Sequence, residues 1–131
     1  MTGKRVLVID DNAMNRRLVQ VLLKSRGYDV CEAASAPEGF AILAEKRPDI
    51  ILMDIQLPEV DGLTATRKLK ADPTTRDIPV VAVTSYAMKG DEAMALEAGC
   101  SAYVTKPIDK TLFLETVARM LEGTPRTDGA G

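Results

Sequence analysis

The chain has 131 residues, of which 46% are hydrophobic and 27% charged, and its formal net charge is −2. This size is typical of a single domain with its own core, and the weak negative charge disfavours nucleic acid as the main partner, because a phosphate backbone binds basic surfaces. The sequence contains two cysteines and no histidine. Zinc therefore has too few ligands, and neither a phosphohistidine carrier nor a Ser-His-Asp or Cys-His catalytic site can be built.

The first apolar run covers residues 6–9 and leads directly into Asp10 and Asp11. A short, uninterrupted run of this kind is typical of a strand that is buried on both faces of a sheet. It is far too short for a signal peptide or a membrane span, so we expect a cytoplasmic protein without membrane contact.

Helical patterns alternate with further apolar runs along the rest of the chain. Asn12 is placed to cap a first helix that ends before Gly27. On one face of this helix fall Met14, Leu18, Val21 and Leu22. Further strands are expected over residues 28–33, 50–53, 80–83 and 102–105, and further helices over residues 36–46, 63–71, 91–98 and 110–121. The last helix is expected to bury Phe113, Val117 and Leu121.

This alternation predicts an α/β fold. Continuous apolar strands joined by helices favour a parallel sheet that is covered on both faces, in one domain over residues 1–122. Residues 123–131 contain three glycines, one proline and no large apolar side chain. We expect these residues to form a disordered tail, which leaves no room for an attached output domain.

Polar residues of a particular kind stand where four of the strands end. They are Asp10 and Asp11 after the first strand, Asp54 after the third, Thr84 after the fourth and Lys106 after the fifth. Ligand sites in open parallel sheets lie outside the carboxyl ends of the strands, so these side chains are expected at one edge. Three carboxylates in one place repel each other, and an all-oxygen set favours a hard divalent cation, above all Mg²⁺.

Together these side chains suit a phosphoryl group. Lys106 adds a fixed positive charge, and the Thr84 hydroxyl can donate to a phosphoryl oxygen. Asp54 is the expected nucleophile, attacking phosphorus to form an acyl phosphate, and small Ser85 leaves room for the approach. The adjacent residues Asp10 and Asp11 are expected either to be metal ligands or to orient other groups of the site.

The motifs resemble those of one family, the receiver domains of two-component response regulators. Residues 8–12 resemble its acidic opening, residues 52–62 its phosphoacceptor strand and loop, and residues 83–85 and 98–107 its last two strand ends. The match covers about residues 4–122. The resemblance implies a flavodoxin-like (βα)5 three-layer sandwich with a five-stranded parallel sheet of order 2-1-3-4-5.

The resemblance also implies a role for each site residue. Asp54 would be the phosphoacceptor, with Mg²⁺ held by Asp11, Asp54 and the backbone carbonyl of Gln56. Asp10 would act through a metal-bound water. Lys106 would pair with the phosphoryl group, and the Lys106–Pro107 peptide bond would be cis.

A switch follows from the same resemblance. Thr84 would move toward a phosphoryl oxygen, and the ring of Tyr103 would turn inward. The surface that changes would be the fourth helix, the fifth strand and the fifth helix, over residues 87–121. Lys89, Asp91 and Glu92 would belong to this surface or form an ordinary solvated helix face.

The predicted partners are proteins. A chain without histidine must take its phosphoryl group from a sensor histidine kinase or a histidine phosphotransfer protein. This donor would dock against the first helix around Asn15, Leu18 and Leu22. Output would pass by contact to a downstream protein target, with the chain itself a monomer or weak dimer. The chain would phosphorylate itself and slowly dephosphorylate itself, as a switch rather than a turnover enzyme.

Within the family, residues 54–59 and 79–92 resemble stand-alone cell-cycle regulators of the DivK type. Ser85 and Tyr86 differ from the Ala-Phe pair expected there, a change that could tune the lifetime of the phosphoryl group.

Three other classes of protein share some of these features. An aspartate-nucleophile phosphatase would carry a DxDx[TV] motif, whereas Asp54-Ile55-Gln56 lacks the second aspartate. A flavodoxin would follow its first strand with hydroxyls and glycines, whereas this chain has two acids. A degenerate receiver, which binds partners without phosphorylation, is disfavoured by the complete site but stays open.

Overall fold

Strands and helices alternate along the whole part of the chain that the computed structural model describes, which is residues 3–57, 61–84 and 91–123. The strands are β1 (Arg5–Ile9), β2 (Asp29–Ala33), β3 (Ile50–Asp54), β4 (Val80–Thr84) and β5 (Ala102–Thr105). The helices are α1 (Ala13–Lys24), α2 (Ala36–Glu45), α3 (Gly62–Ala71), α4 (Asp91–Ala98) and α5 (Lys110–Gly123). Each of them lies within a few residues of its predicted place.

The five strands form one sheet of order β2-β1-β3-β4-β5, and all neighbouring strands are parallel. The strand order reverses between β1 and β3, which is the switch point of a flavodoxin-like sheet. The predicted (βα)5 fold and strand order are therefore confirmed. Every residue of β3 and β4 is buried, as their unbroken apolar runs predict.

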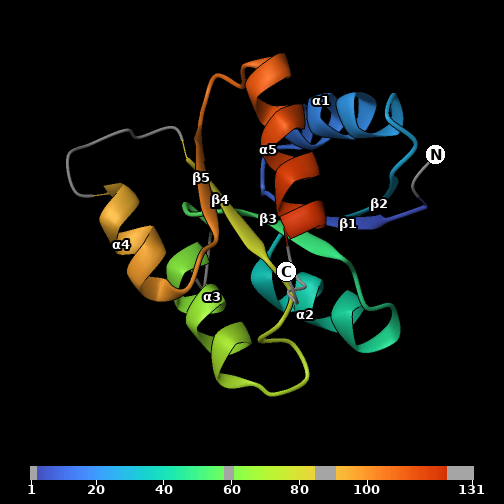
Figure 1. The fold of residues 1–131 in the computed structure, drawn as a ribbon. Helices are drawn as coiled ribbons and strands as arrows, with labels where there is room; N and C mark the ends of the chain where they lie inside the picture. Colours follow the sequence, from blue (N-terminus) through green and yellow to red (C-terminus); the bar gives the residue numbers. More distant parts are fainter. Residues whose placement is uncertain (1–2, 58–60, 85–90, 124–131) are drawn as a thin grey trace.

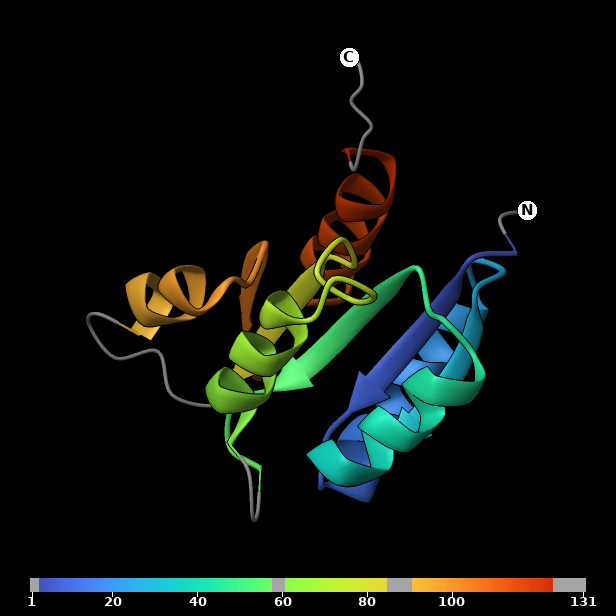
Figure 2. The ribbon, with the colours of Figure 1, turned by 90° about the horizontal axis from the view of Figure 1, so that it is seen from below.

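Two cores flank the sheet, because successive strand residues point to opposite faces. Val6, Val8, Leu52 and Val81 pack with α1 and α5, whereas the alternate residues Leu7, Ile9, Met53 and Ala82 pack with α2, α3 and α4. Figures 1 and 2 show the resulting three layers, with α1 and α5 on one side of the sheet. Phe113 and Val117 of α5 are fully buried and Leu121 is partly buried, as predicted.

Helix α1 buries only part of its apolar surface. Its buried side chains are Val19, Leu22 and Leu23. Of the four residues that the sequence places on one face, Leu22 is buried, whereas Met14, Leu18 and Val21 are 82%, 44% and 59% exposed. Apolar residues cover an arc of this helix that is wider than one face, and the half centred on Val19 and Leu23 packs on the sheet. The other half forms an apolar stripe in solvent.

The ends of the helices follow local signals. The Asn12 side chain accepts a hydrogen bond from the Asn15 N–H at 3.0 Å, so the predicted cap of α1 is confirmed. Gly27 has a φ of 85°, the left-handed conformation that glycine permits after a helix. Helix α5 runs two residues past its predicted end, to Gly123. The rest of the predicted tail, residues 124–131, lies outside the described residues. Of the helices described, none has the length and apolar character needed to cross a membrane.

Candidate functional site

The carboxyl ends of four neighbouring strands meet at one edge of the sheet. Asp10 directly follows β1, Asp54 is the last residue of β3, Thr84 is the last residue of β4, and Lys106 directly follows β5. The register fixes their depth, because Ile9 pairs with Met53 one residue before each aspartate. The structure thus brings together side chains that are up to 96 positions apart in the sequence.

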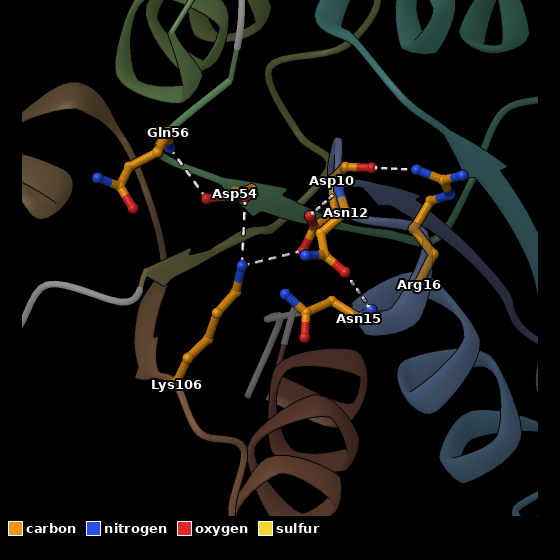
Figure 3. Close-up of polar contacts among 7 residues, drawn as sticks. All are labelled: Asp10, Asn12, Asn15, Arg16, Asp54, Gln56 and Lys106. Atoms are coloured by element: carbon orange, nitrogen blue, oxygen red, sulfur yellow. Dashed lines mark hydrogen bonds and ion pairs between the residues drawn. The ribbon is translucent and has the colours of Figure 1, made fainter.

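Lys106 lies between two buried aspartates. Its Nζ is 3.2 Å from Asp10 Oδ2 and 3.3 Å from Asp54 Oδ2. The three side chains are 12%, 7% and 4% exposed, in the order Lys106, Asp10, Asp54. Figure 3 shows the ammonium group reaching from β5 toward the ends of β1 and β3. Because buried ion pairs are only weakly screened by solvent, the electrostatic interactions among these three side chains are strong.

Each aspartate is also fixed by its own backbone. Asp54 Oδ1 accepts the Gln56 N–H at 2.9 Å, and Asp10 Oδ1 accepts the Asn12 N–H at 2.8 Å. In both cases one oxygen is held by the amide two residues ahead and the other by Lys106, as Figure 3 shows. Neither carboxylate has to reorganise to face the site.

Burial raises the pKa of the Asp54 carboxyl above its ordinary value, and the negative charge of Asp10 adds to this effect. The Gln56 N–H and the Lys106 ammonium act in the opposite direction, but they do not cancel it. The ionised form of Asp54 is therefore under-compensated. A further cation beside Asp54, or transfer of an electrophile to one of its carboxylate oxygens, would offset this negative charge.

Asp10, Asp11 and Asp54 each place a carboxylate oxygen within 4.8 Å of the others. Asp10 and Asp54 are buried, whereas Asp11 is exposed toward solvent. The donors are all oxygens, and the most buried of the three is under-compensated. This set fits a hard divalent cation such as Mg²⁺, which prefers one or two carboxylates and keeps several waters.

Thr84 and Tyr103 lie on neighbouring strands beside this cluster. Thr84 is 2% exposed, and its carbonyl accepts the Lys106 N–H at 2.7 Å. Tyr103 is half-buried and packs against the core under α2, α3 and α4. The Lys106–Pro107 peptide bond is cis, as predicted. Ser85, Tyr86 and Lys89 lie outside the described residues.

Two residues at the site have no predicted role in the sequence. Arg16 Nη1 donates to the Asp10 carbonyl at 2.7 Å. Gly62 is packed so closely that a Cβ would overlap the Asp54 carbonyl oxygen and lie 2.7 Å from Ile55 Cα. The family motif includes Gly62 but does not show this contact, and no pattern in the sequence marks Arg16.

The fold and the site define a class, a doubly wound α/β protein with an acidic, lysine-bridged cluster at the carboxyl edge of its sheet. Residues 6–118 match the family described as the response regulator receiver domain, and the chain belongs to this family. The flavodoxin and small-molecule phosphatase interpretations are thereby set aside.

Several known proteins resemble most of this chain. It is 46% identical to the polar-differentiation response regulator DivK of Brucella anthropi and to that of Brucella abortus, over 90% of this chain and 96% of each relative. Among solved structures it resembles the receiver domain of a sensor histidine kinase from Pseudomonas aeruginosa, with a TM-score of 0.84 and 32% identity over 92% of this chain and 99% of that one. That structure has a magnesium ion coordinated in its active-site cleft. A CheY-like receiver domain from Methanospirillum hungatei gives a TM-score of 0.85 and 30% identity, over 93% of this chain and 96% of that one.

Proposed function

We propose that this receiver domain accepts a phosphoryl group on Asp54 from a phosphohistidine donor and passes the signal on by protein contact. The observation that carries this proposal is the Lys106 ammonium, which bridges the buried carboxylates of Asp10 and Asp54. A positive charge already stands beside the expected nucleophile, where the charge of a transferring phosphoryl group would develop.

The expected transfer is a single displacement. A carboxylate oxygen of Asp54 attacks phosphorus, the P–N bond to the donor imidazole breaks, and its electron pair leaves with the imidazole. The Gln56 N–H holds the carboxylate in place during the attack. The Lys106 Nζ already lies between the carboxylates of Asp10 and Asp54. It would therefore need little movement to contact the oxygens of a phosphoryl group on Asp54.

Magnesium is the cofactor that these residues fit. Asp11, Asp54 and the Gln56 carbonyl would hold it, with Asp10 acting through a bound water, and it would offset the negative charge on the transferring group. The magnesium ion in the similar Pseudomonas receiver supports this assignment.

The donor is expected to dock on α1. Receiver domains take phosphoryl groups from histidine kinases or phosphotransfer proteins, and the exposed apolar stripe of Met14, Leu18 and Val21 is a suitable surface for such a protein. The predicted contact at Leu22 needs a correction, because this side chain is only 9% exposed and belongs to the core. Leu18 is 44% exposed and stays a predicted contact.

The response is expected to run through Thr84 and Tyr103 to α4, β5 and α5. Thr84 would turn toward a phosphoryl oxygen and Tyr103 would follow inward, changing partner affinity about five- to a hundredfold, as is typical of such coupling. Partner affinity of Tyr103→Ala should then no longer respond to beryllofluoride. An equal response in wild type and variant would remove Tyr103 from the switch.

The relatives point to a cellular role. Their similarity over nearly their whole length supports a place in polar differentiation or cell-cycle control. The cytoplasmic location, the monomeric or weakly dimeric state and the boundary of the domain at residue 122 stay predictions. So does the character of a self-modifying switch rather than a turnover enzyme.

The test is an intact mass after incubation with Mg²⁺ and acetyl phosphate. Wild type should gain one phosphoryl group, and Asp54→Asn and chelation of Mg²⁺ should each abolish the gain. A wild-type protein that gains no mass and also shows no response to beryllofluoride would instead be a degenerate receiver. A gain that persists in Asp54→Asn would place the acceptor elsewhere.

A further inference from the structure

Arg16 of α1 makes two polar contacts at the edge of the site. Its Nη1 donates to the Asp10 carbonyl at 2.7 Å, and its Nε donates to Glu32 Oε1 on β2 at 3.3 Å. The Arg16 side chain is only 19% exposed and that of Glu32 is 30% exposed. Figure 3 shows the guanidinium beside the backbone of Asp10, on the side away from Lys106.

The carbonyl that Arg16 binds stands just beyond the sheet. The Asp10 N–H still bonds to the Ala33 carbonyl at 3.0 Å, as the last contact between the ends of β1 and β2. The Asp10 carbonyl follows this contact, and a short, charge-assisted bond from Arg16 holds it. This carbonyl belongs to the peptide plane that joins Asp10 to Asp11. Its orientation therefore sets where the Asp11 side chain begins.

Asp11 is the member of the acidic cluster that most needs such support. Asp10 and Asp54 are buried and bound by Lys106, whereas Asp11 is exposed. We propose that Arg16, oriented by Glu32, is a positioning residue that fixes the Asp10–Asp11 peptide and so preorganises the acidic cluster for a divalent cation. This inference rests on the proposed function, because it concerns the same cation site.

The choice of residue type agrees with this role. A guanidinium is planar and carries donors in a fixed fork, so Nε and Nη1 can serve Glu32 and the Asp10 carbonyl at the same time. An ammonium has only one nitrogen, so it would lose the two-nitrogen fork with which Arg16 holds these two acceptors. The ion pair with Glu32 alone would only tie α1 to β2, whereas the bond to the Asp10 carbonyl reaches the site itself.

The sign of the effect separates positioning from simple electrostatics. Removing a positive charge near a cation site should strengthen Mg²⁺ binding if charge alone matters. If Arg16 positions Asp11, Arg16→Gln should instead weaken Mg²⁺ binding about tenfold or more, the size typical of lost support behind metal ligands. Arg16→Lys keeps the charge and should weaken binding as well. Glu32→Gln should weaken it less.

Arg17 offers a matched control, because it is the next residue of the same helix and is exposed. Arg17→Gln removes the same charge and should leave the affinity unchanged or slightly higher. The affinity is measured by Mg²⁺ titration of backbone amide shifts in the unphosphorylated protein, and the same spectra show whether each variant is folded. If Arg16→Gln does not fold, Arg16→Lys and Glu32→Gln decide.

The outcomes distinguish this inference from the proposed function. Wild type that binds Mg²⁺ while the Arg16 variants bind it equally or more tightly would overturn the positioning role and leave the proposed function intact. Wild type that binds no Mg²⁺ would overturn both. Weaker binding in Arg16→Gln and Arg16→Lys, with Arg17→Gln unaffected, supports the inference.

Discussion

The two ends of the sheet each hold a lysine, and the two lysines have opposite kinds of partner. At the carboxyl edge, Lys106 pairs with the carboxylates of Asp10 and Asp54. At the amino edge, Lys70 of α3 donates to the backbone carbonyls of Arg76 and Ile78, at 3.0 Å and 2.7 Å. The partners of Lys106 can change charge by binding a proton, a cation or a phosphoryl group. The hydrogen-bond partners of Lys70 are backbone carbonyls, which carry fixed dipoles.

Burial disfavours charge at both ends of the sheet. It raises the pKa of Asp54 and lowers the pKa of Lys70, in each case toward the neutral form. The charge on Asp54 can be offset by a new ligand. Lys70 is enclosed by its own chain, since its stem lies against Gly99, where a Cβ would be 2.5 Å from Lys70 Cγ. The charge at the carboxyl edge can therefore change when a ligand binds, whereas the contacts of Lys70 at the amino edge are structural.

The largest expected effect tests the carboxyl edge. Lys106→Met removes the cation that lies between Asp10 and Asp54, so the charge of the transferring group is left unbalanced. The rate of adduct formation from acetyl phosphate should fall about 10²–10³-fold, as for loss of a donor to transition-state charge. Intact mass against time measures this rate at saturating Mg²⁺.

Lys70→Met is the matched control for this experiment. It is the same substitution at the other end of the sheet, and it should leave the rate of adduct formation within about twofold, provided that the measurement is made where the variant is folded. A comparable loss of rate in both variants would contradict the division between the two ends.

The next effect concerns Gly62, at the start of α3. A Cβ at this position overlaps the Asp54 carbonyl oxygen and crowds Ile55 Cα. Since both are backbone atoms that cannot turn away, Gly62→Ala should lower the free energy of unfolding by about 2–3 kcal/mol and also weaken Mg²⁺ binding. Urea unfolding and Mg²⁺ titration measure the two effects.

Gly39→Ala provides the comparison, because its Cβ would instead meet the Ile9 side chain, 2.5 Å from Cδ1. That side chain can adopt another rotamer, so the loss should be smaller and Mg²⁺ binding should be unchanged. Equal effects of the two substitutions would mean that contact with the Asp54 backbone has no special consequence.

Much of the fold, and the position of the site at the carboxyl edge, could be predicted from the sequence for a physical reason. Residues 6–9, 50–53 and 80–83 form unbroken apolar runs because their strands are buried on both faces, and parallel strands bring their ends to one edge. Asp54 and Lys106 could thus be placed together from strand order alone. Their contacts in the structure agree with this placement.

The parts that could not be predicted depend on where helices rest on the sheet. The apolar arc of α1 spans more than one face, so its pattern does not decide that Val19 packs inward and Met14 stays in solvent. The contact of Arg16 with Asp10 depends on that same rotation. Nothing in the sequence distinguishes Lys70 from an ordinary solvated lysine on the last turn of a helix. Its carbonyl partners, Arg76 and Ile78, depend on the path of the loop that follows α3.

Lys70→Met should have a moderate effect, on stability alone. The variant keeps the stem that packs on Gly99 but leaves the two carbonyls without their charged donor. Hydrogen bonds to charged groups contribute about 2 kcal/mol each, and the variant loses two of them. Because the variant no longer has to bury an ammonium group, part of this loss is offset, and a net decrease of about 2 kcal/mol in the free energy of unfolding is expected. Urea unfolding measures it, and an unchanged midpoint would show that the amino edge does not depend on this lysine.

The smallest effect compares the two ends of α3 through their aspartates. Asp61 caps the helix at the carboxyl edge, accepting the Thr64 N–H at 2.9 Å. Asp72 stands at the amino edge and accepts the Thr74 N–H at 2.8 Å, outside the helix. Only Asp61 satisfies an amide of the first helical turn, so Asp61→Ala should cost about 1 kcal/mol of unfolding free energy and Asp72→Ala less.

The pH dependence identifies the origin of this loss. Chiefly through the Thr64 N–H, the pKa of Asp61 lies below its ordinary value. The unfolded chain therefore binds the proton more readily, and the contribution of Asp61 is present above the unfolded pKa of about 3.9 and is lost as the pH falls through the lower, folded value. Asp61→Asn keeps the acceptor without the charge, so it should keep most of the stability and lose this pH dependence. An Asp61→Ala deficit that is the same at pH 7 and pH 2 would mean that helix packing, and not the ionised cap, fixes this end of α3 beside the site.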